Sequence, residues 1–195
     1  MKTIGLFGGT FDPVHCGHEA MARAALVEGV DHLIVMPCHR SPFKLEAGGF
    51  AEPTSGEHRW QMLNLVFGDE PRIEVSRHEI EGPPISYTWQ TLEFLWGLYP
   101  EDRLCLILGQ DQYELLSQWA RIEVWGSRVD FLIFGRGTDY GRKSSDPGWR
   151  LRWSSRTIPD VSSTMVREAL AEGEEGRNIL HPKVRDYIHR QGLYR

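Results

Sequence analysis

The chain has 195 residues, of which 41% are hydrophobic and 25% are charged, a balance typical of folded globular proteins. This length suits a single domain, which we expect to span residues 1–195. The formal net charge of −5 argues against a general nucleic-acid or anionic-membrane binder, because such proteins depend on excess positive charge. No apolar run approaches the roughly 20 residues that cross a bilayer, and the amino-terminal run is too short for a signal peptide. We therefore expect a cytoplasmic protein without nucleic-acid or membrane partners.

Apolar runs bounded by turn residues predict strands, and apolar residues at helical spacing predict helices. The first half of the chain is predicted to contain strands at 3–7, 32–36 and 72–76, with helices at 17–27 and from a capping box at Thr54 and Glu57 to about 67. The second half is predicted to contain a helix at 88–99, strands at 103–108 and 128–134, and helices at about 163–171 and 182–190. Because strands alternate with helices, we expect an α/β fold with a doubly wound, Rossmann-like parallel sheet and helices on both faces. Ligands bind such sheets beyond the carboxyl ends of the strands, which here are followed by residues 8–18, 37–44, 109–119 and 135–142.

The first of these loops reads Gly8-Gly9-Thr10-Phe11-Asp12-Pro13-Val14-His15-Cys16-Gly17-His18. Two glycines after a strand let the backbone approach a bulky anion, and the amino-terminal end of the next helix attracts negative charge. His15 and His18 are three residues apart, so they share one face of the first helical turn and can donate hydrogen bonds to phosphate oxygens. The alternative is that Thr10 and Asp12 only cap the helix and the histidines are solvated. The position after a strand and a Gly-Gly turn favours a phosphate site.

The segment GGTFDPVHCGH resembles the signature of the nucleotidyltransferase superfamily, in which an H-x-G-H motif binds the triphosphate of a nucleotide. Later segments are similar to its branch of nicotinate mononucleotide adenylyltransferases, namely Ser86-Tyr87-Thr88, Gly109-Gln110-Asp111, Trp119, Val161–Arg167 and Gln191–Tyr194. The resemblance spans the whole chain and implies a nucleotidyltransferase-type fold. It also implies transfer of the adenylyl group of ATP to nicotinate mononucleotide, which gives nicotinate adenine dinucleotide (deamido-NAD) and pyrophosphate in a step of NAD biosynthesis.

The resemblance also implies a set of site residues. Those expected to be catalytic are His15, His18, Lys44 and Arg167. Those expected to bind ATP are Gly8, Gly9, Thr10, Phe11, His18, Gly109, Asp111, Arg136, Ser162, Ser163 and Arg167. Those expected to bind the mononucleotide are Lys44, Tyr87, Thr88 and Trp119. Magnesium is expected to be held mainly by phosphates and water, so no protein metal site is predicted. The expected partners are ATP and a pyridine mononucleotide, and a homo-oligomer stays open.

Several of these residues also have a plainer interpretation. Ser162 and Ser163 at a helix start can form an anion clamp with Arg167, or Ser caps the helix beside a surface arginine. Asp111 can accept hydrogen bonds from ribose hydroxyls, or it can cap a helix over 112–118. Trp119 can stack on a pyridine ring, or it can belong to the core.

The chain departs from the family pattern in two loops. The usual Pro-Pro-His-Lys reads Ser41-Pro42-Phe43-Lys44, so an expected histidine is Phe43, for which His39 or Arg40 could compensate. The usual Arg-Pro-Gly reads Arg136-Gly137-Thr138, which weakens the expectation that Arg136 packs against adenine. The effect of both departures stays open.

Alternatives to the adenylyltransferase hypothesis also stay open. A related enzyme could act on nicotinamide mononucleotide or phosphopantetheine, and a non-catalytic sensor would bind ATP without releasing pyrophosphate. Cys16, His18, Cys38 and His39 could form a zinc set, although their spacing is unusual for zinc. The basic segment 136–156 is expected to be a solvated loop that covers the nucleotide rather than a nucleic-acid strip.

Overall fold

The computed structural model describes residues 1–42, 52–135 and 148–195, in which six strands form one sheet with the order β3-β2-β1-β4-β5-β6. The strands are β1 (Thr3–Gly9), β2 (His32–Pro37), β3 (Ile73–Val75), β4 (Arg103–Gly109), β5 (Asp130–Phe134) and β6 (Arg150–Ser154). Every neighbouring pair is parallel. The predicted doubly wound parallel sheet is therefore confirmed. The strand order reverses between β1 and β4, where such sheets bind ligands.

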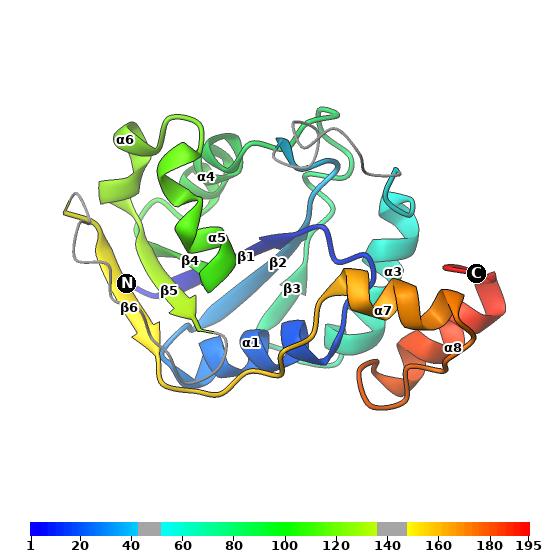
Figure 1. The fold of residues 1–195 in the computed structure, drawn as a ribbon. Helices are drawn as coiled ribbons and strands as arrows, with labels where there is room; N and C mark the ends of the chain where they lie inside the picture. Colours follow the sequence, from blue (N-terminus) through cyan, green and yellow to red (C-terminus); the bar gives the residue numbers. More distant parts are fainter. Residues whose placement is uncertain (43–51, 136–147) are drawn as a thin grey trace.

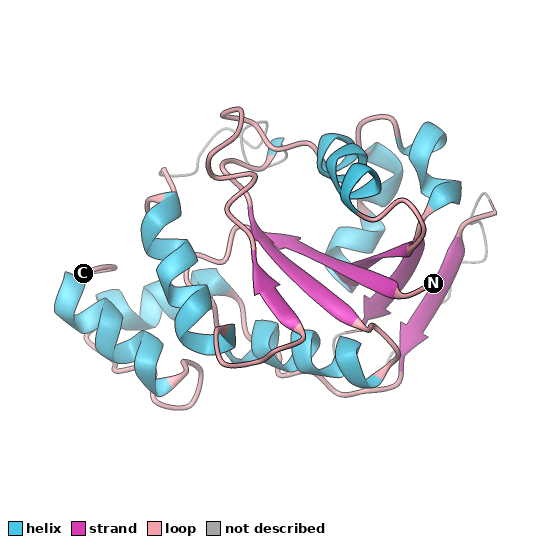
Figure 2. Ribbon diagram, turned by 180° about the vertical axis from the view of Figure 1, so that it is seen from behind, coloured by secondary structure: helices cyan, strands magenta, loops and turns pink. Residues whose placement is uncertain are grey.

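Helices cover both faces of the sheet (Figures 1 and 2). The helices are α1 (Cys16–Val27), α3 (Gly56–Phe67), α4 (Thr88–Leu98), α5 (Gln110–Glu114), α6 (Ile122–Trp125), α7 (Ser163–Ala171) and α8 (Pro182–Gln191), with 3-10 turns η1 (Leu116–Gln118) and η2 (Gly126–Arg128). Apolar side chains of α1, α3, α7 and α8 form a buried cluster with Phe7 and Val35. Those of α4, α5 and α6 form a second cluster with Leu6 and Ile34. Successive strand residues point to opposite faces, so each strand contributes to both clusters.

The structure differs from the sequence prediction at three places. The helix predicted from a capping box at Thr54 and Glu57 is capped instead by Ser55, whose hydroxyl accepts a hydrogen bond from the amide of His58 at 3.3 Å. Residues 150–154 were expected to belong to a loop, but they form the edge strand β6, in which Leu151 and Trp153 pack on the second core cluster and alternate with Arg150 and Arg152. This alternation is typical of a strand with one buried face. The helix expected over 112–118 begins earlier, at Gln110, and continues as the 3-10 turn η1.

None of the helices in the described part of the chain is both long and apolar enough to span a membrane.

Candidate active site

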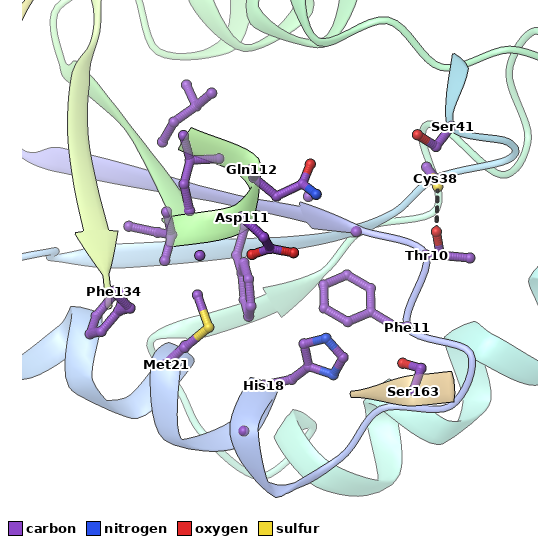
Figure 3. Close-up of a pocket in the computed structure, with 18 of the residues that line it drawn as sticks. Thr10, Phe11, His18, Met21, Cys38, Ser41, Asp111, Gln112, Phe134 and Ser163 are labelled. Atoms are coloured by element: carbon purple, nitrogen blue, oxygen red, sulfur yellow. Dashed lines mark hydrogen bonds between the residues drawn. The ribbon is translucent and has the colours of Figure 1, made fainter. Parts of the chain in front are cut away.

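A cavity of about 500 Å³ lies at the carboxyl ends of β1 and β4. Every predicted site residue within the described ranges lines it, namely Gly8, Gly9, Thr10, Phe11, His15, His18, Tyr87, Thr88, Gly109, Asp111, Trp119, Ser162, Ser163 and Arg167. Lys44 and Arg136, like the unusual Phe43 and Gly137, lie outside the described residues. Figure 3 shows Phe11, His18 and Asp111 around one hollow. Tertiary structure thus brings together residues that are far apart in the sequence.

The loop of residues 8–18, called the phosphate loop after its predicted role, carries two histidines that are stacked at the start of α1. Their ring centroids are 3.7 Å apart with an interplanar angle of 27°. The backbone N–H of His15 donates to Nδ1 of His18 at 3.3 Å. Because Nδ1 of His18 is an acceptor, the neutral ring carries its proton on Nε2, where it can serve as a donor. His15 is buried and His18 is partly exposed, so His18 is the more accessible of the two.

The glycine between the histidines is closely packed. A Cβ atom on Gly17 would lie 3.1 Å from the His15 ring and 3.1 Å from the carbonyl oxygen of Pro159, a contact that is tighter than normal. The helix start is also tied to a distant segment, since the Cys16 amide donates to the carbonyl of Ile179 at 2.9 Å. This amide is therefore committed to the protein, and fewer free N–H groups of α1 are available to an anion than the sequence suggested.

The start of α7 is joined directly to the phosphate loop. Ser162 is the N-cap of α7, and its hydroxyl accepts a hydrogen bond from the amide of Met165 at 3.2 Å. The hydroxyl of Ser163 donates to the carbonyl of Pro13 at 3.0 Å. Nη1 of Arg167 donates to the carbonyl of Asp12 at 2.7 Å. The capping interpretation thus holds for Ser162, while Ser163 and Arg167 bring a guanidinium and a helix start to the cavity wall.

The opposite part of the cavity is formed by the loop after β2 and the start of α4. Tyr87 is the N-cap residue of α4 and Thr88 begins the helix. The hydroxyl of Ser86 accepts a hydrogen bond from the His39 amide at 2.9 Å, and the Ser86 amide donates to the carbonyl of Arg40 at 3.0 Å. This pairing holds the Ser-Tyr-Thr segment against the loop that leads towards Lys44.

Asp111 and Trp119 lie in the segment that follows β4. Asp111 is exposed in the first turn of α5 and lines the cavity. Trp119 is partly buried, and its ring lies 6.3 Å from that of Trp125, measured between centroids. Trp119 packs against the core, as its plainer interpretation predicts, and it also lines the cavity, so stacking on a pyridine ring stays a prediction.

Sequence reasoning missed Glu79, which also lines the cavity. Its Oε1 accepts a hydrogen bond from the Thr91 hydroxyl at 2.5 Å. Burial raises the pKa of the Glu79 carboxyl, and hydrogen bonds from Thr91 and Ser86 offset part of that rise. No local motif marks this residue, since it lies in an irregular segment between β3 and α4.

The zinc hypothesis finds no support in the described part of the chain. There, no group of three or more His, Cys, Asp or Glu side chains is arranged to hold a metal ion. Cys38 instead donates from its thiol to the Thr10 hydroxyl at 3.7 Å (Figure 3).

The fold and the phosphate-loop geometry define a nucleotide-binding α/β protein, and the chain belongs to the cytidylyltransferase-like family, whose sequence model matches residues 6–169. Within that family it is similar to nicotinate-nucleotide adenylyltransferases. It is 34% identical over 197 residues to the enzyme of that name from Bacillus subtilis, with 100% of this chain and 99% of the relative covered. It is 36% identical over 202 residues to a probable nicotinate-nucleotide adenylyltransferase from Gloeobacter violaceus, with 99% and 96% covered.

Solved structures confirm the fold. The nicotinic acid mononucleotide adenylyltransferase of Plasmodium falciparum complexed with NaAD superposes with a TM-score of 0.81 at 22% identity, covering 100% of this chain and 98% of that one. A putative nicotinate-nucleotide adenylyltransferase from Vibrio parahaemolyticus gives a TM-score of 0.70 at 20% identity, covering 100% and 96%.

Proposed function

We propose that this chain transfers the adenylyl group of ATP to nicotinate mononucleotide, giving nicotinate adenine dinucleotide and pyrophosphate in NAD biosynthesis. One observation carries the proposal. The ends of α1 and α7, with His18 and Arg167, line the same cavity as Tyr87, Thr88 and Trp119. A triphosphate on the first group would place its α-phosphorus near an acceptor held by the second. Sequence relatives with this activity in their names support the assignment.

In this reaction a phosphate oxygen of the mononucleotide attacks the α-phosphorus of ATP, a new P–O bond forms, and the bond to the pyrophosphate leaving group breaks. The chemistry depends on positioning and on stabilisation of negative charge, so no protein nucleophile is required. In this proposal, His18 Nε2 and the Arg167 guanidinium donate hydrogen bonds to the phosphate oxygens. His15 supports the ring of His18. Ser162 and Ser163 support the same end of the triphosphate. Lys44 is proposed to neutralise the reacting phosphates.

The remaining predicted residues are proposed to hold the two nucleotides. Gly8, Gly9, Thr10 and Phe11 would border the triphosphate, and Gly109 and Asp111 would meet the ribose. Arg136 would pack against adenine. Trp119 would stack on the pyridine ring, with Tyr87 and Thr88 beside it.

Magnesium is proposed as the counterion of the triphosphate. Mg²⁺ favours phosphate and water oxygens over an all-protein cage. His18 and Arg167 would then share with the ion the charge that develops on pyrophosphate.

The test is pyrophosphate release with magnesium-ATP and, in parallel, nicotinate mononucleotide, nicotinamide mononucleotide and phosphopantetheine. We expect strong preference for the nicotinate substrate. Activity with another acceptor alone would keep the mechanism and reassign the acceptor pocket. If ATP binds but no pyrophosphate is released with any of the three acceptors, the result would favour a nucleotide sensor.

We also propose a cytoplasmic location, where thiols stay reduced. Free Cys16, Cys38 and Cys105 support this assignment. Burial raises the pKa of the Cys105 thiol to about 12, which keeps it unreactive.

A further inference from the structure

Arg59 of α3 is only 1% exposed, although its side chain is long and charged. Within the described part of the chain, its side-chain hydrogen bonds run to backbone carbonyl oxygens. Nε donates to Thr54 at 2.7 Å. Nη1 donates to Thr10 and to Cys38, both at 2.8 Å, and Nη2 donates to His39 at 3.3 Å. A buried guanidinium is costly unless its donors are satisfied, so this geometry indicates a specific role.

Three of the four carbonyl groups bound by Arg59 belong to loops that follow two neighbouring strands, and the fourth, that of Thr54, lies just before α3. Thr10 lies in the phosphate loop after β1, whereas Cys38 and His39 lie in the loop after β2. A single nitrogen, Nη1, donates to both loops and therefore sits between them. The loop after β2 in turn holds the Ser86 segment through the amide of His39. Arg59 thus links the proposed triphosphate half of the cavity to its proposed acceptor half.

We propose that Arg59 is a positioning residue for adenylyl transfer, which fixes the spacing between the triphosphate loop and the acceptor side of the cavity. This inference rests on the proposed function. A shift of the two halves by a fraction of an ångström would misalign the attacking oxygen with the α-phosphorus while leaving each binding surface intact. Misalignment of this kind lowers the rate of the chemical step more than it weakens binding.

The guanidinium suits this role better than an ammonium group. Its planar fork carries five N–H donors in fixed directions, so it can serve four carbonyl groups at once. Lysine has a single nitrogen that ends about one bond short of the position of Nη1, so its ammonium does not reach between the two loops and cannot serve all four carbonyls. Arg59→Lys therefore keeps the charge and most of the volume while it removes the link between the loops.

The experiment compares Arg59→Lys with Met62→Ala. Met62 is a fully buried residue of the same helix, and its truncation destabilises α3 without removing a hydrogen bond to either loop. Pyrophosphate release is measured well below the thermal midpoint of each variant. We expect Arg59→Lys to lower kcat by about 10- to 100-fold and to change the two KM values far less. We expect Met62→Ala to lower Tm while kcat stays close to that of the wild type.

A second readout does not depend on activity. The amides of Cys38, His39 and Ser86 are hydrogen-bonded within the linked segments. We expect Arg59→Lys to speed hydrogen exchange at these amides. In Met62→Ala, the exchange rates of these amides relative to those of the rest of the chain should stay unchanged.

The outcomes separate the two proposals. An inactive wild type whose linking amides nevertheless exchange faster in Arg59→Lys would overturn the proposed function and keep the structural link. Unchanged exchange, or equal losses of kcat in Arg59→Lys and Met62→Ala, would overturn the positioning role. So would a rise in the KM for ATP with kcat unchanged.

Discussion

The hydroxyl of Tyr194 donates a 2.5 Å hydrogen bond to Oδ1 of Asp12, which joins the carboxyl-terminal segment to the phosphate loop. Asp12 is buried, and its Oδ2 accepts a second hydrogen bond from the amide of Thr54 at 3.2 Å. The carbonyl of the same residue accepts from Arg167. Asp12 is therefore the point at which the carboxyl-terminal segment, the segment before α3, and α7 all meet the phosphate loop.

Tyr194→Phe removes the donor and leaves the buried Asp12 carboxylate with less compensation. We expect the free energy of unfolding to fall by about 1–3 kcal/mol, and we expect the KM for ATP to rise because Asp12 also receives Arg167. Urea unfolding and steady-state kinetics measure the two effects. Tyr187→Phe is the matched control, since it loses a hydroxyl that lies 2.8 Å from Nδ1 of His58, on the outer contact between α3 and α8. If the control lowers ATP affinity equally, the effect is not specific to the phosphate loop.

The hydroxyl of Tyr194 should also make the stability of the fold depend on pH in the alkaline range. Burial, followed by the nearby Asp12 charge, raises the pKa of the Tyr194 hydroxyl above its usual value of about 10. Above that pH the unfolded chain loses this proton before the folded chain does, so the folded state becomes less stable as pH rises. Urea midpoints at pH 9 and pH 11 should therefore fall more in the wild type than in Tyr194→Phe. Parallel curves would contradict the prediction.

His18→Ala should lower turnover far more than stability. The ring is partly exposed, and its Nε2 is the proposed donor to phosphate, a type of contact whose loss costs about 10²- to 10³-fold in kcat. Pyrophosphate release and the thermal midpoint are measured on the same preparation. His189→Ala, on the exposed side of α8, should leave the rate unchanged. A folded His18→Ala variant with a near-normal rate would remove His18 from the proposed site.

Trp119→Ala should raise the KM for the mononucleotide and leave that for ATP nearly unchanged. A base stacked on an aromatic ring contributes about 1–3 kcal/mol, which corresponds to an increase of roughly 5- to 150-fold in KM. Trp119→Phe retains an aromatic face and should recover most of the affinity. Saturation with the mononucleotide at the wild-type concentration in Trp119→Ala would refute stacking.

Glu79→Gln should increase the free energy of unfolding more at neutral pH than at acidic pH. Because burial raises the pKa of Glu79, the unfolded chain releases this proton at a lower pH than the folded chain does, and stability falls as pH rises above about 4.3. Glutamine keeps an acceptor for Thr91 and carries no charge. The gain in unfolding free energy from Glu79→Gln should therefore be small at pH 4 and larger at pH 7. A gain that is independent of pH would contradict a raised pKa in the folded protein.

The sequence alone indicated the parallel sheet, the candidate phosphate loop and a serine cap at Ser162 or Ser163, because these depend on local patterns. Apolar periodicity defines which residues face a core, and two glycines followed by a helix start define an anion site over a few residues. The strand β6 escaped prediction because it is only five residues long and contains two arginines. Its regular structure depends on pairing with β5.

Tertiary structure alone decided which distant groups meet at the cavity. Asp12 and Tyr194 are 182 residues apart, and nothing in either segment specifies the other. Arg59 is one of many arginines in the chain, and the sequence near it shows only an amphipathic helix. Its role depends on carbonyl groups, which every residue carries, so side-chain identity gives no signal of the partners. Local chemistry thus predicted a phosphate site, whereas the packing of α3, α7 and the carboxyl-terminal segment determined how the loops of that candidate site are held.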